Sequence, residues 1–475
     1  MHFADSLTAQ RLEALETHLR RENPILVSAV QDFRQLDKLA RRMGLLAPGE
    51  SYATRITWWP MVAILGTFSA GKSSFINSYL SQTLQRTGNQ AVDEKFTVIG
   101  YSGNAAIQTL PGSALDADPR FPFYQFSEEI EKVAAGEGKR IDAYLQLKVC
   151  PCPVLSGKIL IDSPGFDADA QRTSTLRIVD HVIDLSDLVL VFFDARHPEP
   201  GAMRDTLKHL VNNTLKRADS EKFLFILNQI DSSAREDNLE DIVAAWQRAL
   251  GEQGLTAGRF YTVYNADAAP PIADETVRRR LEAKRDNDLA AIQERMQQVG
   301  VQRAYRIVNS LERTAQAIER QAVPLLQSAL ERWRRWVLGA DGLFLALLAG
   351  WLWHSNRLPD FSSLWRGEAG TLAYLWLVVL ILGIGGVHFS IRRLAAQWVG
   401  QALQRDTALP TQGYGDLLAA WRKNTSVWRP LAWPSPLGWG HGARKRLRQL
   451  HTRVDKHVQN LNDHYAQPNP PAEGR

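Results

Sequence analysis

The chain is poor in cysteine, has no evident internal repeat and lacks a signal-peptide pattern at its start. Its 475 residues include two cysteines, Cys150 and Cys152. Disulfides are therefore not expected to hold this fold, which is compatible with a reducing, cytosolic environment. A single C-x-C also lacks the second ligand pair of a structural zinc site, so zinc is not expected. The first residues lack the basic-then-apolar order of a secretory signal.

The excess of positive over negative charge is also small overall, although it is unevenly spread along the chain. The formal net charge is +5, yet from Ile391 to the end 13 Lys and Arg stand against 5 Asp and Glu. A basic tail of this kind suits either nucleic acid or an anionic membrane surface. The length allows two or three domains. The choice between nucleic acid and membrane as the partner of the tail depends on the segments that precede it.

A complete phosphate-loop motif, G-x-x-x-x-G-K-[ST], occupies residues 66–73. It follows an apolar run at 61–65 and precedes a helix-like stretch at 74–80, the strand-loop-helix context in which backbone N–H groups surround a phosphate. Lys72 is expected to reach the β- and γ-phosphates, and the Ser73 hydroxyl to hold Mg²⁺. The residues expected to bind nucleotide here are Gly66, Ser69, Ala70, Gly71, Lys72, Ser73 and Ser74.

A second nucleotide motif, D-x-x-G, stands at 162–165, directly after the apolar run 159–161. Alone this motif is common, but its place downstream of a phosphate loop and at a strand end makes it specific. Asp162 is expected to hold Mg²⁺ through water, and Gly165 to serve catalysis by donating its N–H to the γ-phosphate.

A third motif follows two further strand-like runs. The apolar run 188–193 fits a buried parallel strand, and the run 222–227 ends in Asn-Gln-Ile-Asp at 228–231. This tetrapeptide is similar to the N/T-K-x-D motif, in which the Asp accepts two hydrogen bonds from guanine. Asn228 and Asp231 are therefore expected to bind the base, although Gln229 stands where the motif has Lys. A polar loop at a strand end is the alternative.

Together these motifs make the chain resemble the dynamin superfamily. The residues that carry the resemblance are Gly-Thr-Phe-Ser-Ala-Gly-Lys-Ser-Ser (66–74), Asp-Ser-Pro-Gly (162–165), Phe-Phe-Asp-Ala (192–195) and Asn-Gln-Ile-Asp (228–231). The resemblance covers about residues 55–270. It implies an α/β P-loop NTPase domain of the dynamin type, a mostly parallel sheet flanked by helices, that uses GTP and Mg²⁺. Residues 159–231 are most similar to the Eps15-homology-domain branch, whose members include proteins that hydrolyse ATP.

Two departures from the resemblance concern catalysis. Phe68 stands where many dynamins carry a Gln that positions the attacking water. The switch-I Thr, which would serve catalysis and hold Mg²⁺, is expected to be Thr97, with Thr87 as second candidate. Thr97 also alternates as a β-strand residue would, so a purely structural role is the alternative. Slow hydrolysis, raised by assembly, is expected.

Two apolar segments predict a transmembrane helical hairpin over residues 336–392. The arm 371–391 contains no formally charged residue and is long enough to span a bilayer. Its apolar side chains favour insertion by about 5 kcal/mol. The arm 336–353 contains Asp341 near one end, where a charge can reach the interface. The alternatives are a re-entrant or interfacial first arm and a buried core helix for the second.

The charges that flank the two arms predict their orientation. Arg334 and Arg335 precede the first arm, and Arg392 and Arg393 follow the second, whereas the connecting segment 354–370 is balanced. The positive-inside rule then places both outer flanks in the cytoplasm. We therefore expect an integral membrane protein, in the inner or plasma membrane if bacterial, with the nucleotide domain and the tail both cytoplasmic.

The tail, residues 393–475, is basic and rich in tryptophan. Of the 14 Trp in the chain, 11 fall between Trp333 and Trp439, and those of the tail are interleaved with Arg, Lys, Pro and Gly. This mixture favours an interfacial segment on anionic lipid, and nucleic acid is not expected. A solvated basic linker is the alternative. The end, 467–475, has the composition of a disordered segment.

Helical periodicity predicts a stalk. Residues 1–50 contain two amphipathic stretches, at 6–22 and 25–43, and 275–335 repeats the spacing of three and four with a kink expected near Pro324. These segments are expected to form a coiled-coil-like helical bundle.

This layout predicts a membrane-anchored GTPase that forms a homodimer or higher oligomer through its nucleotide domains and tethers, remodels or fuses membranes. Three alternatives stay open: a nucleotide-gated membrane scaffold with negligible hydrolysis, an ATPase of the Eps15-homology type and, last, a DNA-binding membrane NTPase.

Overall fold

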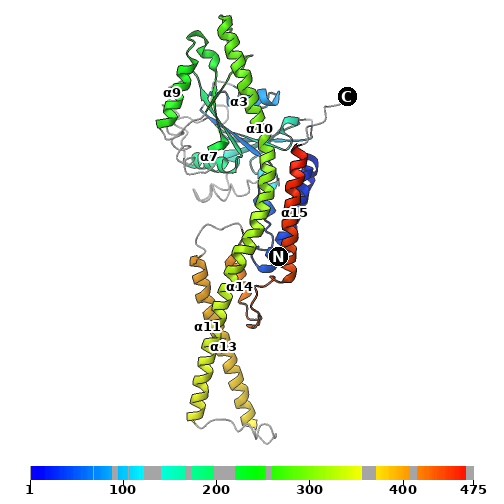
Figure 1. Ribbon diagram of the computed structural model, residues 1–475, viewed down its shortest axis with the longest axis vertical. Helices are drawn as coiled ribbons and strands as arrows, with labels where there is room; N and C mark the ends of the chain where they lie inside the picture. Colours follow the sequence, from blue (N-terminus) through cyan, green and yellow to red (C-terminus); the bar gives the residue numbers. More distant parts are fainter. Residues whose placement is uncertain are drawn as a thin grey trace. The chain divides into compact units, whose positions relative to one another are not determined.

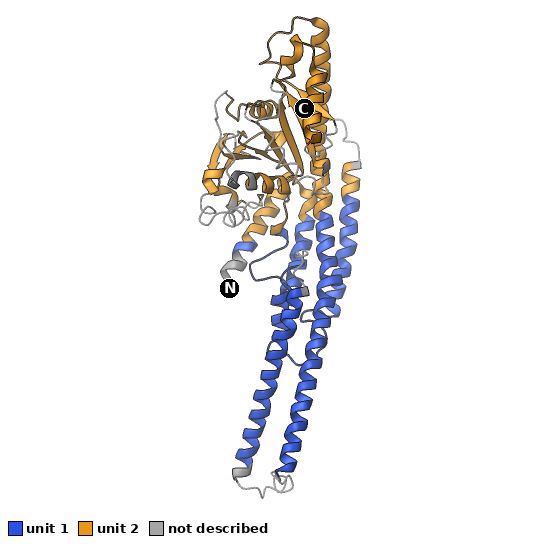
Figure 2. Ribbon diagram, turned by 90° about the vertical axis from the view of Figure 1, so that its left-hand side faces the viewer, with its two compact units in different colours: residues 1–9, 28–53, 308–460 blue, residues 10–27, 54–307, 461–475 orange. Residues whose placement is uncertain are grey.

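The computed structural model describes residues 2–67, 69–87, 95–104, 106–118, 120–121, 141–165, 173–196, 220–252, 259–355, 371–406 and 414–466. The chain divides into two compact units (Figure 2). Unit 1 comprises Met1–Ala9, Ser28–Ala53 and Val308–Asn460, and unit 2 comprises Gln10–Val27, Thr54–Ile307 and Leu461–Arg475. The predicted amino-terminal bundle segment, residues 1–50, is thus shared between the two units.

Unit 2 is built on a mixed sheet (Figure 1). The sheet has eight strands in the order β3-β4-β2-β5-β1-β6-β7-β8. The strands are β1 (Met61–Gly66), β2 (Phe96–Tyr101), β3 (Gln108–Pro111), β4 (Leu145–Cys150), β5 (Ile159–Asp162), β6 (Leu188–Asp194), β7 (Phe223–Asn228) and β8 (Phe260–Val263). The β2–β5 and β3–β4 pairs are antiparallel, and the other pairs among the described strands are parallel. The predicted α/β fold class with a mostly parallel sheet is confirmed.

The centre of the sheet consists of the apolar runs that the sequence marks as strands. Strand β1 pairs Ala63 with Ile161 of β5 on one side and with Val189 of β6 on the other. All residues of these three strands are buried. The side chains of a parallel strand covered on both faces point into the core on either side, which explains why the apolar runs are continuous rather than alternating.

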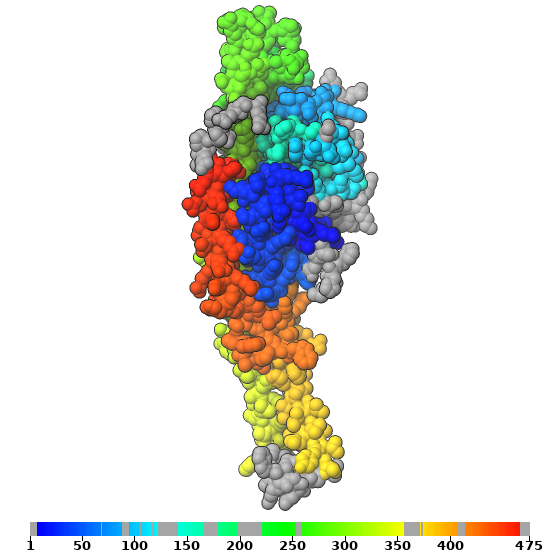
Figure 3. All heavy atoms as spheres, turned by 90° about the vertical axis from the view of Figure 1, so that its right-hand side faces the viewer, coloured from blue at the N-terminus to red at the C-terminus, as the bar shows by residue number. Residues whose placement is uncertain are grey.

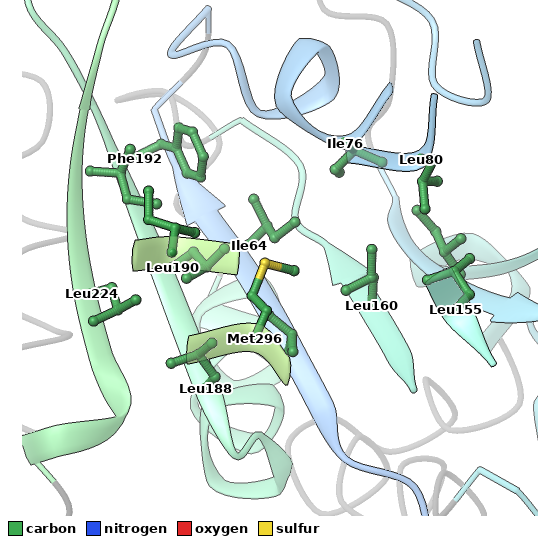
Figure 4. Packing of buried hydrophobic residues seen from close by; sticks show 14 of the residues in the cluster. Ile64, Ile76, Leu80, Leu155, Leu160, Leu188, Leu190, Phe192, Leu224 and Met296 are labelled. Atoms are coloured by element: carbon green, nitrogen blue, oxygen red, sulfur yellow. The ribbon is translucent and has the colours of Figure 1, made fainter. Parts of the chain in front are cut away.

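The helices of unit 2 lie on both faces of the sheet. They are α3 (Lys72–Leu80), α4 (Ala114–Ala117), α6 (Ile141–Tyr144), α7 (Thr173–Leu185) and α9 (Leu239–Glu252), with parts of α1 (His2–Glu22), α10 (Glu275–Ala317) and α15 (His441–Ala466). Ile76 of α3 and Met296 of α10 share one buried cluster with Phe192 (Figure 4). Side chains alternate along a strand, so Phe193 faces the other side, where its ring lies 4.7 Å from that of Trp246 in α9.

A buried carboxylate ties α10 to the sheet. Asp187, one residue before β6, accepts a hydrogen bond from the Met61 N–H at 3.0 Å. Its other contacts are ion pairs with Arg303 at 3.0 Å and Arg306 at 2.7 Å, both on α10. Because Asp187 is only 1% exposed, these cations are the compensation that its charge needs.

Unit 1 is helical. Its helices are α2 (Val27–Met43), α11 (Val323–His354), α13 (Thr371–Asp406) and α14 (Leu417–Asn424), with parts of α1, α10 and α15. Within this unit, α15 lies beside α2 (Figure 3). The buried Asp32 of α2 fixes this contact, because it pairs with Arg453 at 2.6 Å and His457 at 2.8 Å, both on α15.

A π-helical turn, Ile318–Ala322, separates α10 from α11. It lies just before Pro324, near the predicted kink. Proline lacks an N–H, and its ring crowds the carbonyl four residues earlier, here that of Arg320, so the normal helical ladder cannot continue through this turn. Coiled-coil pairing of the long helix stays a prediction.

The two predicted membrane arms are helical and lie side by side in α11 and α13 (Figure 1). Asp341 of α11 and His388 of α13 meet at 2.7 Å, and Trp336 and Trp398 meet edge to face at 6.3 Å. Within the described part of the chain, the helices Glu275–His354 and Tyr374–Arg405 are long and apolar enough to cross a membrane.

The apolar side chains of these arms point outward rather than into a protein core. The most apolar stretches of the two helices are 11% and 0% buried. Soluble proteins rarely expose a continuous apolar surface of this length. This exposure disfavours the alternative of a buried core helix.

Candidate functional site

The phosphate loop joins β1 to α3 as the motif predicts. Gly71 precedes the first residue of α3 with a φ of +83°, and the Phe75 N–H bonds the Gly71 carbonyl at 3.0 Å. A Cβ at Gly71 would lie 1.9 Å from the Asn228 amide nitrogen, so only glycine fits here. The first turn of α3, which contains Ser73 and Ser74, thus opens onto the loop with its N–H groups available to an anion.

Lys72 is buried in the loop as a cation. Its Nζ donates to the Gly66 and Thr67 carbonyls, at 2.9 Å each. Burial lowers the pKa of this ammonium to about 8, and the Asp162 carboxylate opposes the shift. The buried Lys72 ammonium is bonded to neutral carbonyl oxygens, so a negatively charged phosphate would stabilise its charge.

The base-reading motif also holds the phosphate loop. The Asn228 amide donates to the Ala70 carbonyl at 2.8 Å, and the Gln229 amide donates to the Ser69 carbonyl at 2.7 Å. Gln229 adopts the left-handed conformation, with a φ of +65°, which carries its side chain back to the loop. Gln229, which replaces the Lys of the motif, therefore still supplies a hydrogen-bond donor, and this donor links the base-reading motif to the phosphate loop.

Asp162 ends β5 beside the loop and has a partner that the sequence did not reveal. Its Oδ2 accepts a hydrogen bond of 2.6 Å from the buried amide of Gln85. The Lys148 ammonium, in β4, donates to the other side of that amide, to Gln85 Oε1. No motif marks Gln85 or Lys148, and 77 residues of chain separate Gln85 from the carboxylate. Gly165, of the same motif, is partly buried in the loop after β5.

Thr97 lies in β2, where strand pairing places it opposite Asp162. It is 1% exposed, and its hydroxyl accepts a hydrogen bond of 2.7 Å from the Gln146 amide. The alternating strand pattern by itself explains why Thr97 is buried in β2. The roles of Thr97 in Mg²⁺ binding and in switch I therefore remain expectations. Thr87 is exposed before the segment 88–94, which lies outside the described residues, as does Phe68.

Asp231 follows β7 and is half-buried beside a charged pair. Arg196 contacts Asp194 at 2.7 Å, at the end of β6. Burial raises the pKa of the Asp231 carboxyl, and the Arg196 guanidinium opposes the shift. A partly desolvated carboxylate gains from two N–H donors such as those of guanine. The sequence singled out Asp231, whereas nothing in it marked Arg196.

The oxygens near the loop suit Mg²⁺ held mostly by water and phosphate. No cluster of three or more His, Cys, Asp and Glu that could ligate a metal occurs in the part of the chain described. In nucleotide sites Mg²⁺ uses one or two protein oxygens, waters and phosphates. The Ser73 hydroxyl and the Asp162 carboxylate are oxygens of this kind. The neighbouring Ser163 hydroxyl is buried without a hydrogen-bond partner among the described residues, so a polar group bound here would satisfy it.

Two solved structures of an oligomerised bacterial dynamin pair that senses and tethers membranes share some likeness with the chain. One is 12% identical, with 97% of this chain and 76% of that chain covered and a TM-score of 0.32. The other is 14% identical, with 95% and 79% covered and a TM-score of 0.34. Scores of this size carry no inference about fold or function.

Sequence comparison gives relatives and a family for the nucleotide domain. EH domain-containing protein 1 of Homo sapiens is 27% identical over 183 residues, and EH domain-containing protein 3 of Homo sapiens is 28% identical over 183 residues. The aligned part is 36% of this chain and 31% of each relative, so the chain spans under a third of their length. Residues 62–230, which run from β1 through the base-reading motif, match the dynamin family. The nucleotide domain of this chain is therefore similar to that of the dynamin family.

Proposed function

We propose that the chain binds GTP with Mg²⁺, hydrolyses it to GDP and phosphate, and couples this cycle to the tethering, remodelling or fusion of membranes. The observation that carries the proposal is the direct linkage of the two nucleotide motifs. Asn228 and Gln229 hold the loop carbonyls of Ala70 and Ser69, at 2.8 and 2.7 Å. Base recognition and phosphate binding therefore belong to one preorganised site.

Each residue of the site has a chemical task in this proposal. Lys72 neutralises the phosphates, and Asp231 accepts from the guanine edge. Ser73 and Asp162, with Thr97 as an expected third oxygen, would hold the Mg²⁺. When bound, this ion neutralises charge on the β- and γ-phosphates. The Gly165 N–H would contact the γ-phosphate.

The exposed apolar arms support a membrane anchor. Leu347 of α11 is 65% exposed and Leu382 of α13 is 69% exposed. Apolar side chains this exposed are better suited to contact with lipid than with water. A homodimer or larger oligomer, formed through the nucleotide domains, would let anchored copies act on one membrane or on two.

Equilibrium binding to the purified full-length protein tests the nucleotide part. GTP is expected to bind more tightly than ATP in the presence of Mg²⁺. Lys72→Ala removes the charge that bonds the phosphates, so GTP affinity should fall by about 10- to 100-fold. Lys445→Ala, on an exposed residue of α15, should leave affinity unchanged. Failure to bind either nucleotide contradicts the proposal.

A nucleotide-gated membrane scaffold is the second candidate, favoured by the presence of Phe68 at the position where many dynamins carry Gln. This candidate predicts nucleotide binding without turnover, even on liposomes. An Eps15-homology-type ATPase would instead show a preference for ATP that Asp231 substitution leaves unchanged.

A further inference from the structure

A tryptophan-bearing loop in unit 1 is closed by hydrogen bonds around a buried arginine. We call residues 425–440, between α14 and α15, the Trp loop (Figure 1). The Arg429 guanidinium, 7% exposed, donates to the Asn424 side chain and to the Ser435 carbonyl. Asn424 Oδ1 also accepts from the Leu437 N–H at 2.7 Å. These contacts close the loop on itself.

The Trp loop is tied to the end of the apolar part of α13. The Arg392 guanidinium donates to the Ser426 carbonyl at 3.1 Å and to the Arg429 carbonyl at 2.8 Å. Arg392 is the first charged residue after the apolar stretch that begins at Thr371. A loop held at this point lies where a membrane-spanning helix meets the interface.

The loop presents large side chains to solvent. Trp428 is 94% exposed and Trp433 is 67% exposed. Exposed tryptophan is costly in water but is favoured at the headgroup level of a bilayer, where the ring is buried and its N–H stays wet. The hydrogen bonds that close the loop leave both rings exposed, which favours a lipid interface as their surroundings.

Beside the Trp433 ring, a cavity of about 400 Å³ is lined by three arginines: Arg42 of α2, Arg429 of the loop and Arg446 of α15. No carboxylate pairs with any of them among the described residues. The partners given for Arg429 are neutral, and burial lowers the pKa of its guanidinium. Arg429 is buried, whereas Arg42 and Arg446 are exposed at the edge of the cavity. A cavity lined by these three cations favours an anionic ligand.

The backbone brings the three arginines together. Gly438, with a φ of +78°, lies so close to α2 that a Cβ there would be 3.0 Å from the Arg42 carbonyl carbon. The first turn of α15, including Gly440 and Gly442, completes the cavity wall. The start of this long helix adds a favourable potential for an anion to that of the guanidinium groups.

We propose that this cavity binds the phosphate headgroup of an anionic phospholipid, with Trp428 and Trp433 seated in the surrounding interface. The proposal rests on the membrane association proposed above and adds the lipid class and the residues that recognise it. It commits to a lipid rather than a soluble anion because the Trp loop both presents the exposed rings and forms part of the cationic cavity, and is held at the end of an apolar arm.

The test measures lipid binding to the full-length protein in neutral detergent by native mass spectrometry. Phosphatidylglycerol is expected to bind more tightly than phosphatidylcholine. Arg42→Gln with Arg446→Gln should weaken phosphatidylglycerol binding by about tenfold or more. The matched control, Arg444→Gln with Lys445→Gln, removes two positive charges from exposed positions of α15 outside the cavity and should cost less than about threefold.

Equal losses in the two double variants would overturn the cavity site, because binding would then follow net charge alone. Displacement of the lipid by equimolar inorganic phosphate would also overturn it. Unchanged GTP binding in both variants shows that they are folded. Release of the protein from membranes by alkaline carbonate would instead contradict the proposed membrane anchor itself, so the two failures are distinguishable.

Discussion

Lys72 is a buried ammonium whose pKa is lowered to about 8. A bound phosphate favours the protonated form of Lys72, so nucleotide binding must raise the pKa of this side chain. Where the pH leaves the Lys72 amine neutral in the free protein, the protein therefore takes up a proton on binding. Affinity is therefore expected to be highest below pH 8 and to fall as the pH rises through 8. At pH about 8.5, uptake should exceed half a proton per nucleotide. Calorimetry of nucleotide binding in two buffers of different ionisation enthalpy measures the number of protons taken up. No proton uptake at this pH would contradict the contact between Lys72 and the phosphates.

Asp231 is expected to determine which base is bound. Guanine presents two N–H donors to this carboxylate, whereas Asn would offer one acceptor and one donor. Asp231→Asn should weaken GTP binding by about tenfold or more and improve binding of xanthosine triphosphate, whose base has a carbonyl in place of the amine. Competition binding with GTP, ATP and xanthosine triphosphate measures both changes. An unchanged order of preference would remove Asp231 from base recognition.

Gln85 orients the Asp162 carboxylate through a hydrogen bond of 2.6 Å. Gln85→Ala should raise the Mg²⁺ concentration needed for half-maximal nucleotide binding by about threefold to tenfold, since the carboxylate loses its positioning donor. Gln82→Ala, in the same segment after α3, serves as the control. A Mg²⁺ titration of nucleotide binding gives the result. Equal Mg²⁺ requirements in both variants would leave Gln85 a structural residue only.

At the scale of elements, Asp341 and His388 join the two apolar arms at 2.7 Å. His388→Leu leaves the carboxylate without this partner and should lower the unfolding free energy in micelles by about 1 kcal/mol. Leu at both positions should recover much of the loss, because no polar group is then left unpaired. Denaturant titration followed by circular dichroism measures this. A single variant as stable as the wild type would show that the contact contributes nothing.

The elements of the nucleotide domain could be predicted from local sequence. Continuous apolar runs mark β1, β5 and β6 because those strands are buried on both faces, and the phosphate-loop motif marks the start of α3. Contacts between distant segments could not be predicted in this way. The Gln85 bond to Asp162, the Gln229 bond to Ser69 and the arginine cavity depend on how elements pack, which no local periodicity encodes.

At the scale of the whole molecule, the proposal joins a nucleotide site in unit 2 to a membrane anchor in unit 1 of the same chain. Under the positive-inside rule, the positive flanks at Arg334 and Arg392 predict that the nucleotide domain and the tail lie on the same side of the membrane. Because dynamin-like turnover is expected to depend on assembly, the rate per molecule should rise as the surface density of the protein on a vesicle rises.

The most direct measurement is the release of phosphate from GTP and from ATP by the full-length protein in detergent and in proteoliposomes of increasing protein density, beside Lys72→Ala. We expect slow GTP turnover in detergent, a higher rate per molecule in dense proteoliposomes, a lower rate with ATP and none with Lys72→Ala. Turnover that Lys72→Ala retains, or GTP hydrolysis that reconstitution leaves unaffected at every density, would contradict the proposed function.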